Sequence, residues 1–156
     1  MKHLCTLLFA TLLLAAVAAQ ASAMQHDHGG HGQAPAATHT DHQAMIMLGT
    51  VVQDGVRAVA HLNDVRAAMA KAGMKETHHF MVLFEEAGSG KQITAGTAAV
   101  KIMGPDRKES APVALMGMDG HFGADIVLGG KGRYTFTVGS RLPDGKTRQF
   151  EFVLNP

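Results

Sequence analysis

Two methionines and a histidine lie close together in LMGMDGHFGAD, residues 115–125. Met116 and Met118 are two positions apart, which on a strand places both thioethers on one face. His121 follows an Asp-Gly pair, and a turn there can bring its imidazole back toward the two sulfurs. Thioether and imidazole together suit copper, Cu(I) through sulfur and Cu(II) through nitrogen, whereas magnesium and calcium prefer oxygen. One interpretation of the pattern is therefore a copper site at this turn.

The same motif has a purely structural interpretation. Both methionines can fill the open end of a β-sandwich, and His121 can cap a backbone carbonyl. On the motif alone the two interpretations are equally favoured. A metal site would also need a fourth donor from elsewhere in the chain.

A second group of imidazoles lies in residues 24–44, MQHDHGGHGQAPAATHTDHQA. This segment is polar and has no apolar periodicity, so we expect a disordered tail in the absence of a ligand. Its histidines, with His26, His28 and His31 closest together, favour metal capture over an incidental linker. Copper is the expected ion at this tail, with nickel or zinc as alternatives.

The first 23 residues are typical of a cleavable secretory signal. They combine a basic start at Lys2, an apolar run too short to span a bilayer, and small residues at the end. We therefore expect a periplasmic protein with no membrane span after cleavage. Cleavage after Ala23 would make His26 the third residue, whose ring can close a square-planar site with the terminal amine and two amide nitrogens. Cleavage after Ala21 would abolish that chelate.

Composition excludes several classes of function. The single cysteine, Cys5, leaves with the signal, so soft ligation has to come from methionine. The 14 basic residues are scattered among 13 acidic ones, and there is no tryptophan, which argues against nucleic-acid binding. The GSGK of residues 88–91 lacks the rest of a P-loop, and no serine lies in a nucleophile elbow. We expect a binding protein and not an enzyme.

Residues 45–156 have the pattern of an all-β domain. Short apolar runs alternate with turn residues, beginning with two strands around Asp54-Gly55. This pattern predicts an immunoglobulin-like antiparallel β-sandwich of seven to eight strands, with an up-and-down barrel as the weaker choice. The segment NDVRAAMAKAG, residues 63–73, predicts one short crossover helix whose Met69 packs in the core. His78 and His79 begin a strand and point to opposite faces; one can be a ligand, although a structural or surface role is favoured for both.

The segment MGMDGHFGADIVL, followed by Gly-x-Tyr in GRYTFTV, resembles the periplasmic iron-transport family of copper-binding β-sandwich proteins. That family carries a methionine, an Asp-Gly and a His-aromatic-Gly-Ala-Asn run ahead of a Gly-x-Tyr strand, and a His-Leu-Glu-Ala-Asp strand with further ligands. The resemblance spans Met47 to Pro156 and implies His61, Met118 and His121 as copper ligands. The chain departs from the pattern at Asn63, which replaces the acidic ligand. It also has a shorter loop before His121 and no later histidine.

These observations together predict an exported protein that sequesters copper or delivers it. The expected partners are the metal ion and, for delivery, a membrane transporter or another periplasmic metalloprotein. We expect the histidine tail to supply the ligands that the folded domain lacks. A structural or partner-binding periplasmic sandwich is the competing class, and the family also implies an accessory role in iron acquisition. The related YtkA-like and FixH-like exported domains fit the fold equally well without implying a site.

Overall fold

The computed structural model describes residues 45–155, which form nine strands and one short helix. In chain order these elements are β1 (Met45–Gln53), β2 (Val56–Asp64), α1 (Arg66–Lys71), β3 (His78–Glu86), β4 (Gln92–Ile93), β5 (Thr97–Met103), β6 (Val113–Met118), β7 (His121–Ile126), β8 (Tyr134–Arg141) and β9 (Thr147–Leu154). The predicted signal, residues 1–23, and the predicted tail, residues 24–44, lie outside the described residues. The candidate ligands His26, His28 and His31 therefore lie outside them too.

Strict alternation of buried and accessible residues explains why these segments form strands. In β2, the residues from Val56 to Leu62 alternate between buried and half-buried, so one face meets the core and the other faces outward. β8 and β9 follow the same rule. The hairpin between β1 and β2 turns at Asp54 and Gly55, both with positive φ, as the tight two-residue turn requires. The prediction of an all-β domain is confirmed.

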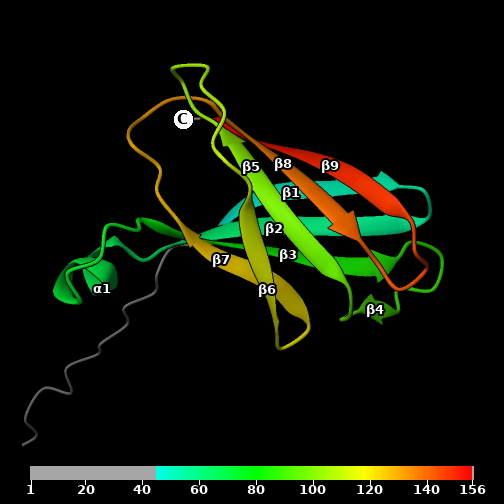
Figure 1. Ribbon diagram of the computed structural model, residues 1–156. Helices are drawn as coiled ribbons and strands as arrows, with labels where there is room; N and C mark the ends of the chain where they lie inside the picture. Colours follow the sequence, from blue (N-terminus) through cyan, green and yellow to red (C-terminus); the bar gives the residue numbers. More distant parts are fainter. Residues whose placement is uncertain (1–44, 156) are drawn as a thin grey trace, which may run out of the picture. The chain divides into compact units, whose positions relative to one another are not determined.

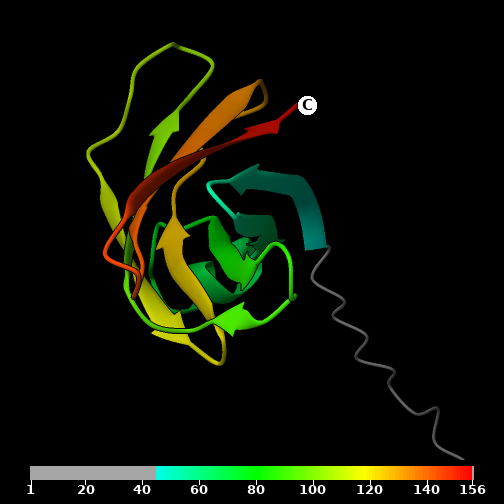
Figure 2. The ribbon, with the colours of Figure 1, turned by 90° about the vertical axis from the view of Figure 1, so that its right-hand side faces the viewer.

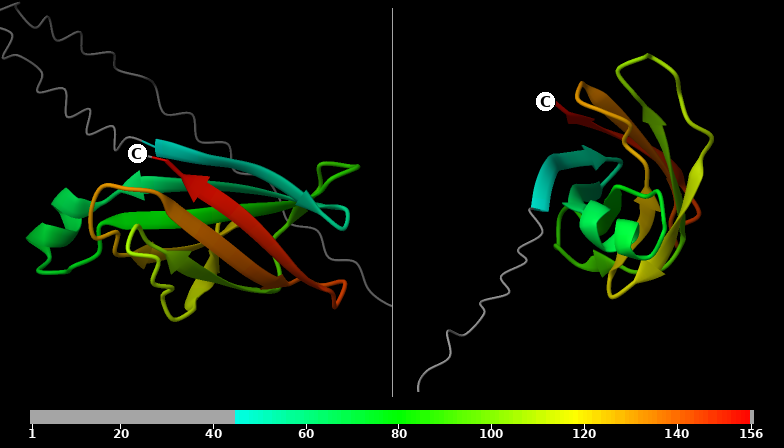
Figure 3. Two further views of the ribbon diagram at one scale, coloured as in Figure 1. Left: turned by 90° about the horizontal axis from the view of Figure 1, so that it is seen from above. Right: turned by 90° about the vertical axis from the view of Figure 1, so that its left-hand side faces the viewer.

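All strand pairs are antiparallel and follow one path, β1-β2-β3-β7-β6-β5-β8-β9, with β4 attached to β3 (Figure 1). β6 joins two sheets. Its first half pairs with β5 in the sheet that continues to β8 and β9, and its second half pairs with β7 in the sheet that contains β1, β2 and β3. Viewed from the ends of the strands, the path curls until β1 approaches β9, which leaves a nearly closed sandwich (Figures 2 and 3). Its immunoglobulin-like form remains a prediction.

Aromatic side chains join the two sheets across the core. Phe80 of β3 stacks on Phe136 of β8 with ring centroids 5.4 Å apart, and Phe84 of β3 meets Phe150 of β9 at 5.5 Å. All four rings are fully buried. Because such buried aromatic residues contribute about 3–5 kcal/mol each when judged by truncation to alanine, they fix which face of β3 points inward.

The helix differs from its prediction. α1 lies between β2 and β3, which are antiparallel neighbours, so it does not make a crossover. It extends from one end of the strands and has no buried residue, and Met69 is only half-buried (Figure 3, left). The prediction that Met69 packs in the core is wrong, because a six-residue helix at the sheet end covers no apolar layer. Among residues 45–155, no helix is long or apolar enough to span a membrane.

Candidate functional site

The β6–β7 hairpin brings three predicted ligands together. Met118 pairs directly with His121 across a two-residue turn, in which Asp119 and Gly120 both have positive φ. Met116 lies two residues before Met118 on the same outward face, and its partner on β7 is Gly123. The two methionines are 70% and 45% exposed, so they do not fill the end of the sandwich. The core-filling interpretation of these residues is therefore wrong.

His61 lies on the same outward face of this sheet but farther away. Its cross-strand partner on β3 is Met81, whose own partner on β7 is Gly123. Two strand spacings, about 10 Å in total, therefore separate the backbone of His61 from the backbone of β7. β3 therefore lies between His61 and His121, a separation that the sequence alone does not show.

The surroundings of His61 favour the neutral form of its ring. Partial burial lowers its pKa, and the nearby imidazoles of His121 and His79 lower it further because two positive charges would repel each other. A neutral ring carries a nitrogen lone pair, which is the form that binds a metal ion. The same causes show that His121 and His79 each lie near enough to His61 to affect it electrostatically.

His79 is a site residue that sequence reasoning did not select. It faces outward from β3 opposite Asp125 of β7, and its Nδ1 lies 2.6 Å from Asp125 Oδ1. A Cβ added at Gly123 would lie only 2.8 Å from His79 Nε2, so the ring occupies the space above that glycine. A signal was present in the sequence, because Phe80 and Phe84 belong to the core and so direct His79 outward.

Exposed methionines form a second pair at the other edge of this face. Met45 and Met47 on β1 are 59% and 57% exposed, and Met47 pairs with His61. Methionine supplies six of the eight large hydrophobic side chains that are exposed among residues 45–155. Four of those six are the two Met-x-Met pairs on β1 and β6, so the thioethers are concentrated on the outward face that carries the imidazoles.

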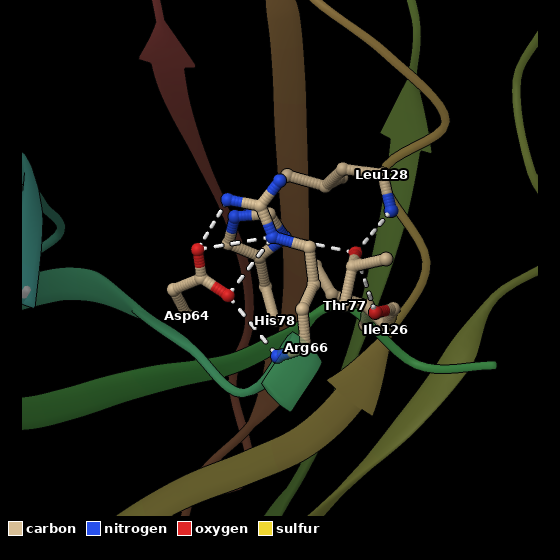
Figure 4. A network of polar contacts seen from close by, with 6 residues as sticks. All are labelled: Asp64, Arg66, Thr77, His78, Ile126 and Leu128. Atoms are coloured by element: carbon tan, nitrogen blue, oxygen red, sulfur yellow. Dashed lines mark hydrogen bonds and ion pairs between the residues drawn. The ribbon is translucent and has the colours of Figure 1, made fainter. Parts of the chain in front are cut away.

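His78 has the opposite orientation and a structural role (Figure 4). Its Nδ1 lies 2.9 Å from Thr77 Oγ1, which donates to the Ile126 carbonyl and accepts the amide proton of Leu128. Burial is the main cause that lowers the pKa of His78, against the opposing charge of Asp64. Asp64 pairs with Arg66, and that hydrogen bond is the main cause that lowers the pKa of Asp64 to about 2. This network fastens the start of β3 to the end of β7.

Within the described part of the chain, no three side chains drawn from His, Cys, Asp and Glu lie close enough to hold a metal ion. A site on this face therefore has to use methionine sulfur as well as imidazole. The β6–β7 hairpin provides that combination. The histidine tail, which is the other predicted source of ligands, lies outside residues 45–155.

Comparison with known proteins supports the fold. No protein-family model matches the chain, and no curated protein matches it. Among solved structures, FetP of uropathogenic Escherichia coli matches with a TM-score of 0.60 and 17% identity, over 72% of this chain and 96% of FetP. A copper-bound variant of FetP matches with a TM-score of 0.59 and 16% identity, over 72% of this chain and 97% of the variant. A DUF4426 family protein of Pseudomonas aeruginosa matches with a TM-score of 0.53 and 14% identity, over 69% of this chain and 92% of that protein. The chain thus shares its fold with these bacterial proteins.

Proposed function

We propose that this protein is an exported copper-binding protein that sequesters the ion or hands it to another protein, without catalysing a reaction. The observation that carries the proposal is the β6–β7 hairpin, where two exposed thioethers and the imidazole of His121 lie on one face. This donor set fits copper because thioethers favour Cu(I) and imidazole accepts both oxidation states. Met116, Met118 and His121 would hold the ion, and His61 lies on the same face.

Two further observations support copper as the cargo. The fold is similar to that of FetP, for which a copper-bound variant has been solved. The pKa of His61 is lowered, so protons compete less strongly for its nitrogen. Delivery would need a partner, and a periplasmic metalloprotein or a membrane transporter fits that role. An open, methionine-rich face suits the transfer of a soft ion, because its donors are accessible from outside.

Metal content tests the proposal. The full chain is purified from cells supplied with copper, next to a Met118→Leu/His121→Ala double variant that retains the histidine tail. We expect the double variant to retain about one copper ion fewer per chain than the wild type. Equal copper in both proteins would assign all binding to the tail and overturn the role of the hairpin. Iron and zinc are measured in the same samples, and iron in place of copper would favour the accessory role in iron acquisition.

A further inference from the structure

The hairpin supplies two sulfurs and one nitrogen, and the strand beside it carries a further outward-facing imidazole, that of His79. β3 pairs directly with β7, and His79 stands opposite Asp125. His61 lies on β2, one strand farther from β7. His79 is therefore the outward-facing imidazole on the strand that pairs directly with the hairpin.

Asp125 fixes the orientation of the His79 ring. The Nδ1–H group donates to Asp125 Oδ1, with 2.6 Å between the two atoms. Because an ionised carboxylate only accepts hydrogen bonds, the tautomer that fits this contact has its proton on Nδ1 and its lone pair on Nε2. A histidine held in this way by a carboxylate is the usual arrangement of metal-binding histidines, in which the carboxylate sets the tautomer and raises the basicity of the ligand.

Gly123 provides the space into which Nε2 points. A Cβ at this position would lie 2.8 Å from His79 Nε2 and 3.1 Å from the carbonyl oxygen of Phe80. The free nitrogen therefore lies over the bare backbone of β7, two residues from His121. Gly123 is also the cross-strand partner of Met116. The nitrogen thus lies over the strand of the hairpin itself, at the position that pairs with Met116.

We propose that His79 Nε2 is the second nitrogen ligand of the hairpin site, with Asp125 as its positioning residue. The completed site has two thioethers and two imidazoles, and its cargo is a soft monovalent ion, Cu(I). This inference rests on the proposed function and refines it, because it gives His79 the place that the family resemblance gives to His61. The His79 side chain is 20% exposed, so the nitrogen is reachable by an ion from solvent.

Nuclear magnetic resonance of the full chain tests the assignment residue by residue. Long-range ¹H–¹⁵N spectra are recorded on ¹⁵N-labelled protein before and after anaerobic saturation with Cu(I), with Ag(I) as an air-stable probe. We expect the Nε2 resonance of His79 to move together with a ring nitrogen of His121, while Nδ1 of His79 stays protonated. Signals from the histidine tail do not interfere, because each imidazole is observed separately.

Substitutions test the geometry. Gly123→Ala should displace the His79 ring and lower the Cu(I) affinity by about 10–100-fold, the usual cost of disturbing the support of a metal ligand. The matched control is Gly139→Ala on β8, where an added Cβ meets no atom within 4 Å and the affinity should not change. Since Gly123→Ala also crowds the Phe80 carbonyl, His79→Gln and Asp125→Asn on the outward face provide variants that leave the core intact. Both should weaken Cu(I) binding, and Asp125→Asn should also shift the Nδ1 proton resonance of His79.

The outcomes separate this inference from the proposed function. If His121 responds to Cu(I) and His79 does not, the hairpin binds copper and the role of His79 is overturned. A His61 resonance that moves in place of His79 would restore the ligand set implied by the resemblance. If neither His121 nor His79 responds at saturation, both proposals are overturned together.

Discussion

The two outward faces of the sandwich obey the same folding rule but carry different chemistry. On β1, β2, β3, β7 and the end of β6, the outward positions include three imidazoles and two pairs of exposed thioethers, alongside charged and aliphatic side chains. On β5, β8 and β9 they hold mainly threonine and charged or amide side chains, such as Thr137, Lys101 and Glu151. Of the four histidines among residues 45–155, His61, His79 and His121 face outward on β2, β3 and β7. Since alternation alone demands only that outward residues tolerate water, the concentration of soft donors on one face points to a function and not to folding.

The inner faces show no such contrast. β3 and β8 both direct phenylalanines into the common core, and Phe80 and Phe136 stack across it. A substitution on either outward face should therefore leave the fold intact, and its effect on copper should depend on which face it alters. This difference between the faces can be measured directly.

Loss of His121 should have the largest effect. His121→Ala removes a ligand itself. Loss of a residue that only supports a ligand lowers metal affinity by about 10–100-fold, so we expect the Cu(I) affinity of His121→Ala to fall by about 100-fold or more. Thr137→Ala on the opposite face is the control and should bind as the wild type does. Competition against a colorimetric Cu(I) chelator measures both. Equal losses in the two variants would mean that the faces do not differ.

The sequence predicted those parts of the site that are local in the chain. The Asp-Gly turns, the alternation of the strands and the Met-x-Met pattern each depend on a few consecutive residues, and the turn after Met118 brings His121 back as expected. The role of His79 depends on the pairing of β3 with β7, which are separated by three intervening strands in the chain. Pairing of this kind is set by long-range packing, so periodicity does not reveal it.

The position of the helix and the role of Gly123 also depend on strand pairing that the sequence does not reveal. The pattern of residues 63–73 predicts the helix, but the position of the helix between two neighbouring strands follows from the strand order. Likewise Gly123 is an ordinary glycine in the sequence, and its use becomes visible only when the His79 ring is found above it. Asn63 stands where the resembling family has an acidic ligand. This difference does not indicate which residue of the chain supplies a donor instead.

Methionine substitutions should have an intermediate effect that depends on oxidation state. Met116→Leu and Met118→Leu keep nearly the same volume and remove only the sulfur, so each should lower the Cu(I) affinity by about tenfold and change the stability by less than about 1.5 kcal/mol. The Cu(II) affinity should not change, because Cu(II) is bound by the imidazole nitrogens and not by the thioethers. Met103→Leu on β5 is the matched control, since Met103 is also exposed but lies on the opposite face. A similar loss in Met103→Leu would show that exposed methionines bind Cu(I) irrespective of their neighbours.

The smallest expected effect is on the pH dependence of stability in the metal-free protein. Burial lowers the pKa of both His61 and His78 in the folded state, so the unfolded chain binds protons there more readily. As the pH falls below about 6.5, the ordinary pKa of histidine, the unfolded state gains protons that the folded state does not, and the free energy of unfolding decreases. The decrease should level off below the folded-state pKa values.

Urea unfolding of the wild type and of His78→Gln at pH 7.5 and pH 5.0 measures this decrease in the free energy of unfolding. The variant should lose less stability than the wild type on acidification. An identical loss would mean that His78 titrates normally in the folded protein and that the network at the start of β3 does not exclude its charged form.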